Sequence, residues 1–214
     1  SFSFVGYPTS PGIIDLSSNQ ILVTLPNGAN VRNLVANFGT TGQYVTVGSG
    51  TVTVIQVSGS SSNNFTTPVV YTVHAADGTT SQYTVIVQNA LSNAKAITSF
   101  SFVGYPASPG IIDLSSNQIL VTLPNGTDVR NLVANFGTTG QYVTVGSGQV
   151  TVIQTSGATS NDFTNPVTYT VHAADGTTAQ YTVAVQVAPS NAKAITSFSF
   201  VGYPTSPGII DLSS

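Results

Sequence analysis

The chain has 214 residues, of which only 5% are Asp, Glu, Lys or Arg, against about 25% in an average soluble domain. Four Lys and Arg residues and a net charge of −3 exclude the dense basic surface that nucleic acids and anionic membranes require. There is no Cys, which excludes disulfides and thiolate chemistry, and no apolar run approaches the roughly 18 residues of a membrane span. We therefore expect no nucleic-acid partner and no membrane insertion within this segment.

One stretch, SFSFVGYPTSPGIIDLSS, opens the chain at 1–18, recurs with one change at 99–116 and returns unchanged at 197–214. The copies start 98 residues apart, close to the size of one β-sandwich domain, about 100 residues, and longer than a solenoid repeat of about 20 to 50 residues. Each repeat can therefore bury a core of its own. The predicted division comprises a first repeat at 1–93 that lacks its leading residues, a second repeat at 94–191, and the first-strand region of a third at 192–214.

Taken in chain order, the first repeat shows short strand-like runs separated by tight turns. Apolar and polar residues alternate within the runs, and Gly, Pro and Asn interrupt them. The run 31–35 also allows a helical turn, but no segment keeps a 3.6-residue period. The strands predicted before the last hairpin are 1–4, 13–16, 20–25, 34–38, 44–47 and 52–57.

The clearest prediction is a hairpin formed by PVVYTVHAADGTTSQYTVIVQ, residues 68–88. Valine and tyrosine alternate with polar residues along its arms, and Asp77-Gly78 suits a type I′ turn, whose two central residues have positive φ. This pattern completes an all-β repeat. The predicted fold is a tandem array of all-β, sandwich-type domains with a 98-residue repeat.

The second repeat tests which face of each strand is buried. Val70 becomes Thr168 and Ile86 becomes Ala184, both at positions expected to face outward, whereas the proposed core positions do not change. A sandwich with one face of each strand buried accounts for this difference. The proposed core positions of the first repeat are Phe2, Phe4, Ile21, Val23, Tyr71, Tyr83 and Val85.

The segments AITSFSF, ILVTLPNGTDVRNLVANF and FTNPVTYTVHAADGTTAQYTV, the last at 163–183, resemble the tandem bacterial Ig-like, or cadherin-like, β-sandwich repeats. Such repeats build the stalks of large cell-surface proteins and adhesins, and the resemblance implies that each 98-residue repeat is an Ig-like β-sandwich domain. The resemblance covers both full copies and the opening of the third. It implies an extracellular or cell-surface setting and brings no catalytic residues with it.

Few residues offer chemistry. His74 and His172 each precede an aspartate by three residues, but a Ser–His–Asp relay also needs a nucleophile held against the pair. No group of His and Asp has metal-ligand spacing, so we predict no catalytic, cofactor-binding or metal-binding residue and no enzymatic activity. Tyr7 and Tyr44 offer an aromatic platform for carbohydrate, although packing in the core or at its rim is the expectation for both.

The returning segment 197–214 shapes the functional prediction, because it holds a first strand without the sheets that the strand would join. We predict a non-enzymatic structural repeat of an extracellular fibre, filament or adhesin stalk that assembles with identical subunits, or with further copies of the repeat, by strand donation or end-to-end packing. The alternative is a glycan- or receptor-binding adhesin module that uses the loops 58–67 and 156–165. The candidate strand-donor residues are Phe198, Phe200, Ile209, Ile210 and Leu212.

Overall fold

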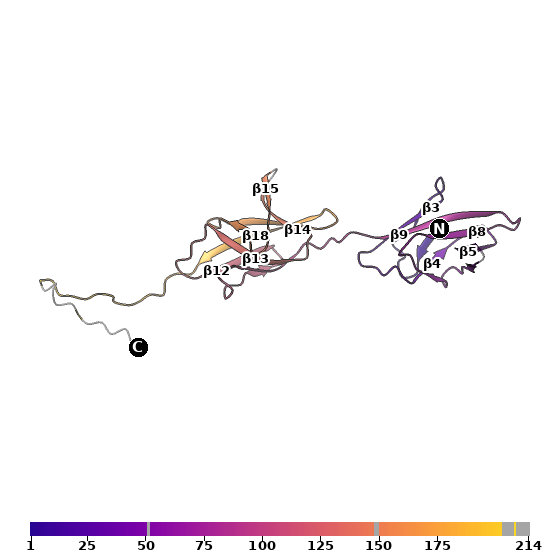
Figure 1. Cartoon of the computed structure of the whole chain (residues 1–214). Coiled ribbons are helices and arrows are strands. Elements are labelled where there is room, and N and C mark those ends of the chain that lie inside the picture. The colour runs from indigo at the N-terminus through magenta and orange to yellow at the C-terminus, as the bar shows by residue number, and fades with distance from the viewer. Residues whose placement is uncertain (51, 148–149, 203–207, 209–214) are drawn as a thin grey trace. The chain divides into compact units, whose positions relative to one another are not determined.

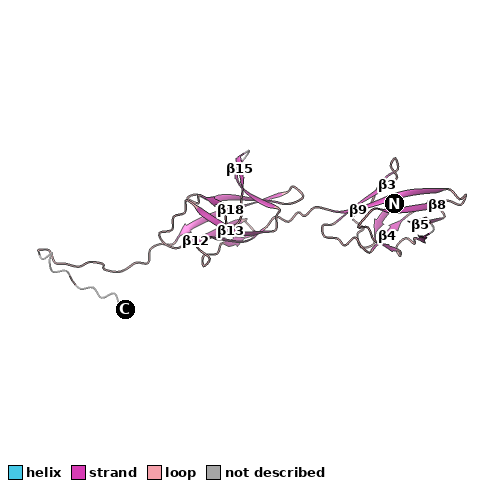
Figure 2. Ribbon diagram, in the orientation of Figure 1, coloured by secondary structure: helices cyan, strands magenta, loops and turns pink. Residues whose placement is uncertain are grey.

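The computed structural model describes residues 1–50, 52–147, 150–202 and 208. These residues form strands, turns and loops, with no helix among them (Figure 2). The chain divides into two compact units, one made of Ser1–Ala94 and Ala174–Gly176 and the other of Lys95–Ala173 and Thr177–Ser214. Each unit contains a β-sandwich of the same topology (Figure 1), so the predicted all-β fold with a repeat of 98 residues is confirmed.

The first sandwich consists of a three-stranded and a six-stranded sheet. Its strands are β1 (Phe2–Phe4), β2 (Ile13–Asp15), β3 (Gln20–Leu25), β4 (Leu34–Phe38), β5 (Tyr44–Ser49), β6 (Val52–Ile55), β7 (Ser62–Asn63), β8 (Val69–His74) and β9 (Thr80–Asn89). The small sheet has the order β1-β4-β7 and the large sheet the order β2-β3-β9-β8-β5-β6. All paired strands are antiparallel except β3 and β9, which run parallel.

The second sandwich repeats this arrangement with a longer first strand. Its strands are β10 (Ile97–Phe102), β11 (Ile111–Asp113), β12 (Gln118–Leu123), β13 (Leu132–Thr138), β14 (Tyr142–Ser147), β15 (Val150–Ile153), β16 (Ser160–Asn161), β17 (Val167–His172) and β18 (Thr178–Val187). The sheet orders are β10-β13-β16 and β11-β12-β18-β17-β14-β15. Because β10 begins at Ile97, it brings one more apolar side chain into the core than β1 does.

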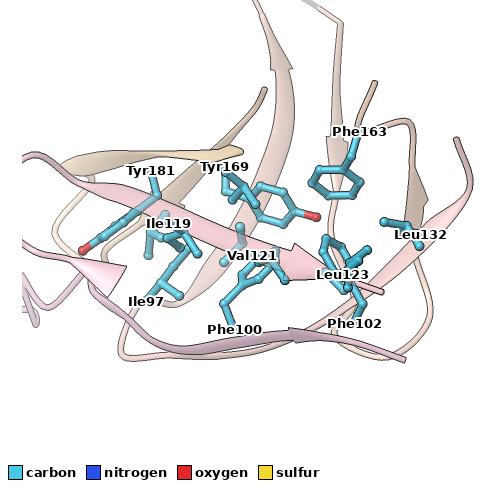
Figure 3. Close-up of a cluster of buried hydrophobic side chains, with 14 residues drawn as sticks. Ile97, Phe100, Phe102, Ile119, Val121, Leu123, Leu132, Phe163, Tyr169 and Tyr181 are labelled. Carbon is cyan, nitrogen blue, oxygen red and sulfur yellow. The ribbon is translucent and has the colours of Figure 1, made fainter. Parts of the chain in front are cut away.

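Alternating residues of both sheets meet in each core. In the second sandwich, Phe100 of the small sheet points toward Tyr169 of the large sheet, and Phe102 packs against Phe163 (Figure 3). The rings of Phe100 and Tyr169 lie edge to face with centroids 5.4 Å apart, an arrangement that aromatic pairs favour. Every proposed core position of the first repeat lies in or against the corresponding cluster of its own sandwich.

The predicted strands are present with small shifts of their ends. The turn of the 68–88 hairpin is not the predicted type I′ turn, because Gly78 has a positive φ of 87° and Asp77 does not. Gly78 N–H instead donates to the carbonyl of Ala75. The runs expected at 44–47 and 52–57 form β5 and β6, and the hairpin expected at 68–88 forms β8 and β9. Near the end of β5, Gly48 has a φ of 132°, and a Cβ there would collide with the carbonyl oxygen of Val52. The helical turn that 31–35 allowed is not formed, since strand β4 begins at Leu34.

Candidate functional site

An exposed aromatic pair lies on the outer face of the large sheet. Tyr44 at the start of β5 is directly opposite His74 at the end of β8, and both have the opposite parity to buried Val45 and Tyr71. Their rings are stacked, with centroids 4.3 Å apart and an interplanar angle of 8°. Tyr44 is 42% exposed, so the stack presents an aromatic surface that water and ligands can reach.

Polar side chains continue from this pair across the sheet. The imidazole Nε2 of His74 lies 3.0 Å from the hydroxyl of Thr46, and Thr46 is buried, with 5% of its surface exposed. Thr72 pairs with Thr46 on one side and with Gln82 on the other. Tyr44, Thr46, Thr72, His74 and Gln82 therefore share one face of β5, β8 and β9, and we name this group the Tyr–His patch.

The second sandwich contains the same patch. The rings of Tyr142 and His172 are stacked with centroids 4.2 Å apart at 8°, and His172 Nε2 lies 3.0 Å from the hydroxyl of Thr144. Tyr142 is also 42% exposed. Thr170 and Gln180 complete the group through the register of β14, β17 and β18. The geometry of the patch is thus the same in both sandwiches, and the sequences around it are nearly identical.

A cavity of about 620 Å³ lies in the first sandwich, next to the start of β1. It is lined by apolar residues such as Val73 and Tyr83 and by the threonines Thr40 and Thr79. In the second sandwich the buried side chain of Ile97 enters the equivalent region of the core. Val171 and Tyr181, which correspond to Val73 and Tyr83, are 0% and 4% exposed there. The cavity therefore includes the position that Ile97 fills in the second sandwich, and we assign no ligand to it.

The loops 58–67 and 156–165, which the alternative function used, are fixed by hydrogen bonds to the sandwich. Asn63 donates through Nδ2 to the Oε1 of Gln56, at 2.7 Å, and to the hydroxyl of Tyr71, at 3.1 Å. Burial raises the pKa of Tyr71 to about 12. Phe65, the aromatic residue of the first loop, is buried. These loops offer polar edges but no exposed aromatic ring.

The structure does not assemble a catalytic or metal centre around the histidines. His74 contacts Thr46, while Asp77 accepts hydrogen bonds from the backbone N–H and hydroxyl of Thr79. These bonds lower the pKa of the Asp77 carboxyl, because they stabilise its ionised form. Among the residues that the structure describes, no three His, Cys, Asp or Glu side chains are grouped for a metal ion.

Two of the predicted strand-donor residues can be placed. Phe198 and Phe200 are 52% and 67% exposed, and their rings touch each other edge to face at 5.3 Å. Ile195, which occupies the position of Ile97 in the repeated AITSFSF segment, is 67% exposed. Ile209, Ile210 and Leu212 lie outside the described residues. Strand donation by this segment stays a prediction.

The sequence offers Tyr44 as a surface for carbohydrate but predicts that it packs in the core or at its rim. The structure instead places Tyr44 on the outer face, whereas Tyr7 packs against the core cluster as expected. The signal that could have found the patch is the parity of Tyr44 and His74, which both alternate with apolar residues.

Comparison with known families covers both sandwiches. Residues 1–87 and 97–185 match the family model described as "SGBP, N-terminal", the N-terminal region of surface glycan-binding proteins. The chain belongs to this family. It is therefore a tandem pair of β-domains of the kind found in surface proteins, and the match does not extend to the finer Ig-like or adhesin-stalk assignment.

Other comparisons add little. No curated protein matches the chain. A crystal structure from Bacteroides thetaiotaomicron, whose name assigns it provisionally to the glycoside hydrolases, aligns with 32% sequence identity over 46% of this chain and 26% of that one. Its TM-score is 0.32, which is too low to carry an argument about activity. Within the described part of the chain, no helix is long and apolar enough to cross a membrane.

Proposed function

We propose that this chain is a non-enzymatic module that binds a glycan at the cell surface, with one binding site on the Tyr–His patch of each sandwich. The observation that carries the proposal is the exposed Tyr44–His74 stack, which recurs with the same geometry as Tyr142–His172. The family to which both repeats belong supports the same ligand class and an extracellular position.

The chemistry of a sugar fits this patch. A pyranose ring has an apolar face of C–H groups and a rim of hydroxyls, so it packs against an aromatic ring while its hydroxyls bond to polar side chains. Tyr44 supplies a rigid aromatic surface at a low cost in side-chain entropy. Gln82 and Thr72 supply an amide and a hydroxyl on the same face. No Asp, Glu, Lys or Arg belongs to the patch, which favours a neutral glycan.

Two equal sites on one chain suit a repetitive ligand. A polysaccharide presents the same sugar unit many times, and a second binding event on the same polymer occurs at a raised effective concentration. The near-identity of the two repeats, which argues against two different ligands, agrees with this arrangement. We therefore infer that the module binds polymeric glycan more tightly than a short oligosaccharide.

A glycan array tests the proposal. The wild-type chain should give saturable binding to a neutral glycan, and the double variant Tyr44→Ala with Tyr142→Ala should lose it. The matched control is Ile13→Ala with Ile111→Ala, which truncates two side chains that are each 72% exposed on a different strand of the same sheet. Binding that survives in the tyrosine variant, or is equally lost in the control, would reject the patch as the site.

A structural repeat in a fibre or stalk is the second candidate function. It is favoured by the near-identity of successive repeats, since a spacer needs only a folded unit that can be copied. A spacer predicts no glycan binding by the wild-type chain across the array. That result would favour a structural role as a spacer over glycan binding.

A further inference from the structure

A two-stranded ribbon extends past the body of each sandwich. In the first sandwich β8 pairs with β5 only from Tyr44 to Val47, whereas β6 pairs with β5 from Thr46 to Ser49. The end of β5 and the start of β6 therefore have no third strand beside them. In the second sandwich β15 pairs with β14 alone and projects from the rest of the sheet (Figure 1). We call β5–β6 and β14–β15 the edge ribbons.

The outermost strand of each edge ribbon exposes apolar side chains on both faces. All four residues of β6 are exposed, and Val52, Val54 and Ile55 are 75%, 61% and 62% exposed. The corresponding residues of β15 are 77%, 54% and 64% exposed. A two-stranded ribbon with both faces in water is marginally stable by itself, so a further strand along this edge would stabilise it.

The backbone of β6 is oriented to accept that strand. Gln56 N–H donates to the carbonyl of Val45, at 2.8 Å, toward the neighbouring strand β5. In an antiparallel ladder successive residues direct their N–H and C=O groups to opposite sides. Thr53 and Ile55 therefore direct theirs to the open edge, because β6 is the last strand of its sheet.

Charge restricts what can pair with this edge. No Asp, Glu, Lys or Arg occurs between residues 33 and 76, or between 131 and 161. Soluble proteins commonly protect an edge strand with Lys or an inward charge, and both edges lack that protection. A charged partner finds no complement here, whereas two identical neutral edges meet without repulsion.

We propose that the open edge of β6 or β15 pairs, antiparallel, with the same edge of a second copy of this chain. The sequence VTVIQ occurs at 52–56 and again at 150–154, so each copy carries two edges of identical composition. Antiparallel pairing places Val, Ile and Thr opposite one another, and β-branched cross-strand pairs are stabilising. The interface is isologous, since the same residues contribute from both copies. It uses the ribbon edge and does not depend on glycan binding by the Tyr–His patch.

Sedimentation velocity on the full chain, over a concentration series up to the millimolar range, tests the pairing. We expect wild-type association that is lost in Val54→Lys with Val152→Lys. The control is Gln88→Lys with Gln186→Lys, which adds the same charge to exposed positions of the central strands β9 and β18 and should leave association intact. A wild-type chain that stays monomeric throughout, or an edge variant that associates like the control, overturns the proposal.

A cross-link identifies the contact itself. Because the chain contains no Cys, Thr53→Cys introduces a single thiol at the open edge, and oxidation should yield a disulfide-linked dimer. Thr24→Cys on strand β3, which lies between β2 and β9, is the matched control and should remain monomeric. Equal cross-linking of the two variants would show that the association does not use the edge. Glycan binding measured on the same variants should be unchanged, which keeps this proposal separate from the proposed function.

Discussion

Ile97 allows the role of the first strand to be measured, because the same heptapeptide AITSFSF occurs with the isoleucine buried in one place and exposed in another. Ile97 is 1% exposed in the core of the second sandwich, whereas Ile195 is 67% exposed. Ile97→Ala removes three buried carbons, and at about 0.8 kcal/mol each the transfer cost is about 2.4 kcal/mol. With the residual void, we expect a loss of about 2.5 to 4 kcal/mol in the free energy of unfolding.

Urea denaturation followed by hydrogen exchange and mass spectrometry assigns the loss to one sandwich, since peptides from each unit report separately. Peptides of the second sandwich should lose protection at lower urea in Ile97→Ala, and those of the first should not change. The control Ile195→Ala should change the free energy of unfolding by less than about 0.5 kcal/mol, as is usual for exposed positions. An equal loss in both variants would refute the reasoning, because Ile195 would then be buried against a partner, as strand donation requires.

Two further predictions concern buried polar groups and acid. Asn63→Ala leaves the side-chain oxygen Oε1 of Gln56 and the hydroxyl of Tyr71 without their donor. Thermal or urea unfolding should therefore show a loss of about 1 to 3 kcal/mol in the free energy of unfolding. A loss below about 0.5 kcal/mol would contradict this prediction. Hydrogen bonds from serines lower the pKa of Asp15 and Asp113 to about 2, below the pKa of about 3.9 for Asp in an unfolded chain. The ionised carboxylates therefore stabilise the folded state above about pH 4, and this contribution is lost as the pH falls toward 2. The double variant Asp15→Asn with Asp113→Asn should weaken the fall of stability with pH in an acid titration. An unchanged midpoint of acid unfolding would contradict the lowered pKa of these carboxyls.

A third prediction in this group concerns alkaline pH: burial raises the pKa of Tyr71 to about 12, above the unfolded value of about 10, so stability should fall as the pH rises from about 10 to 12. Tyr71→Phe should weaken that slope in denaturation curves, and an identical slope would argue that the phenol is not buried.

Much of the fold is predictable from the sequence because strand alternation is local. The hairpin at 68–88 combines two alternating arms with an Asp-Gly turn, and each of these signals acts within a few residues. The parallel pairing of β3 with β9 joins residues such as Gln20 and Thr84, and no local pattern specifies a contact over that separation. The division into sheets of three and six strands depends on such distant contacts.

The candidate sites were harder to predict, for the same reason. Alternation in VTVIQ at 52–56 predicts a strand with one buried face, but all four residues of β6 are exposed. The pairing of β5 with β8 stops at Val47 and Tyr71, so the ribbon separates from the rest of the sheet there. The stack of Tyr44 on His74 depends on the register between β5 and β8. Parity places each ring on the outer face, but only the register brings the two rings together.

The most direct test of the proposed glycan site is the stoichiometry of binding by isothermal titration calorimetry, using a short oligosaccharide from the glycan that the array identifies. The account predicts two sites for each wild-type chain, one site for Tyr44→Ala or for Tyr142→Ala, and none for the double variant. Thermal melting should confirm that all three variants remain folded, since both side chains are 42% exposed. Two sites remaining in the double variant would contradict the assignment of binding to the Tyr–His patch.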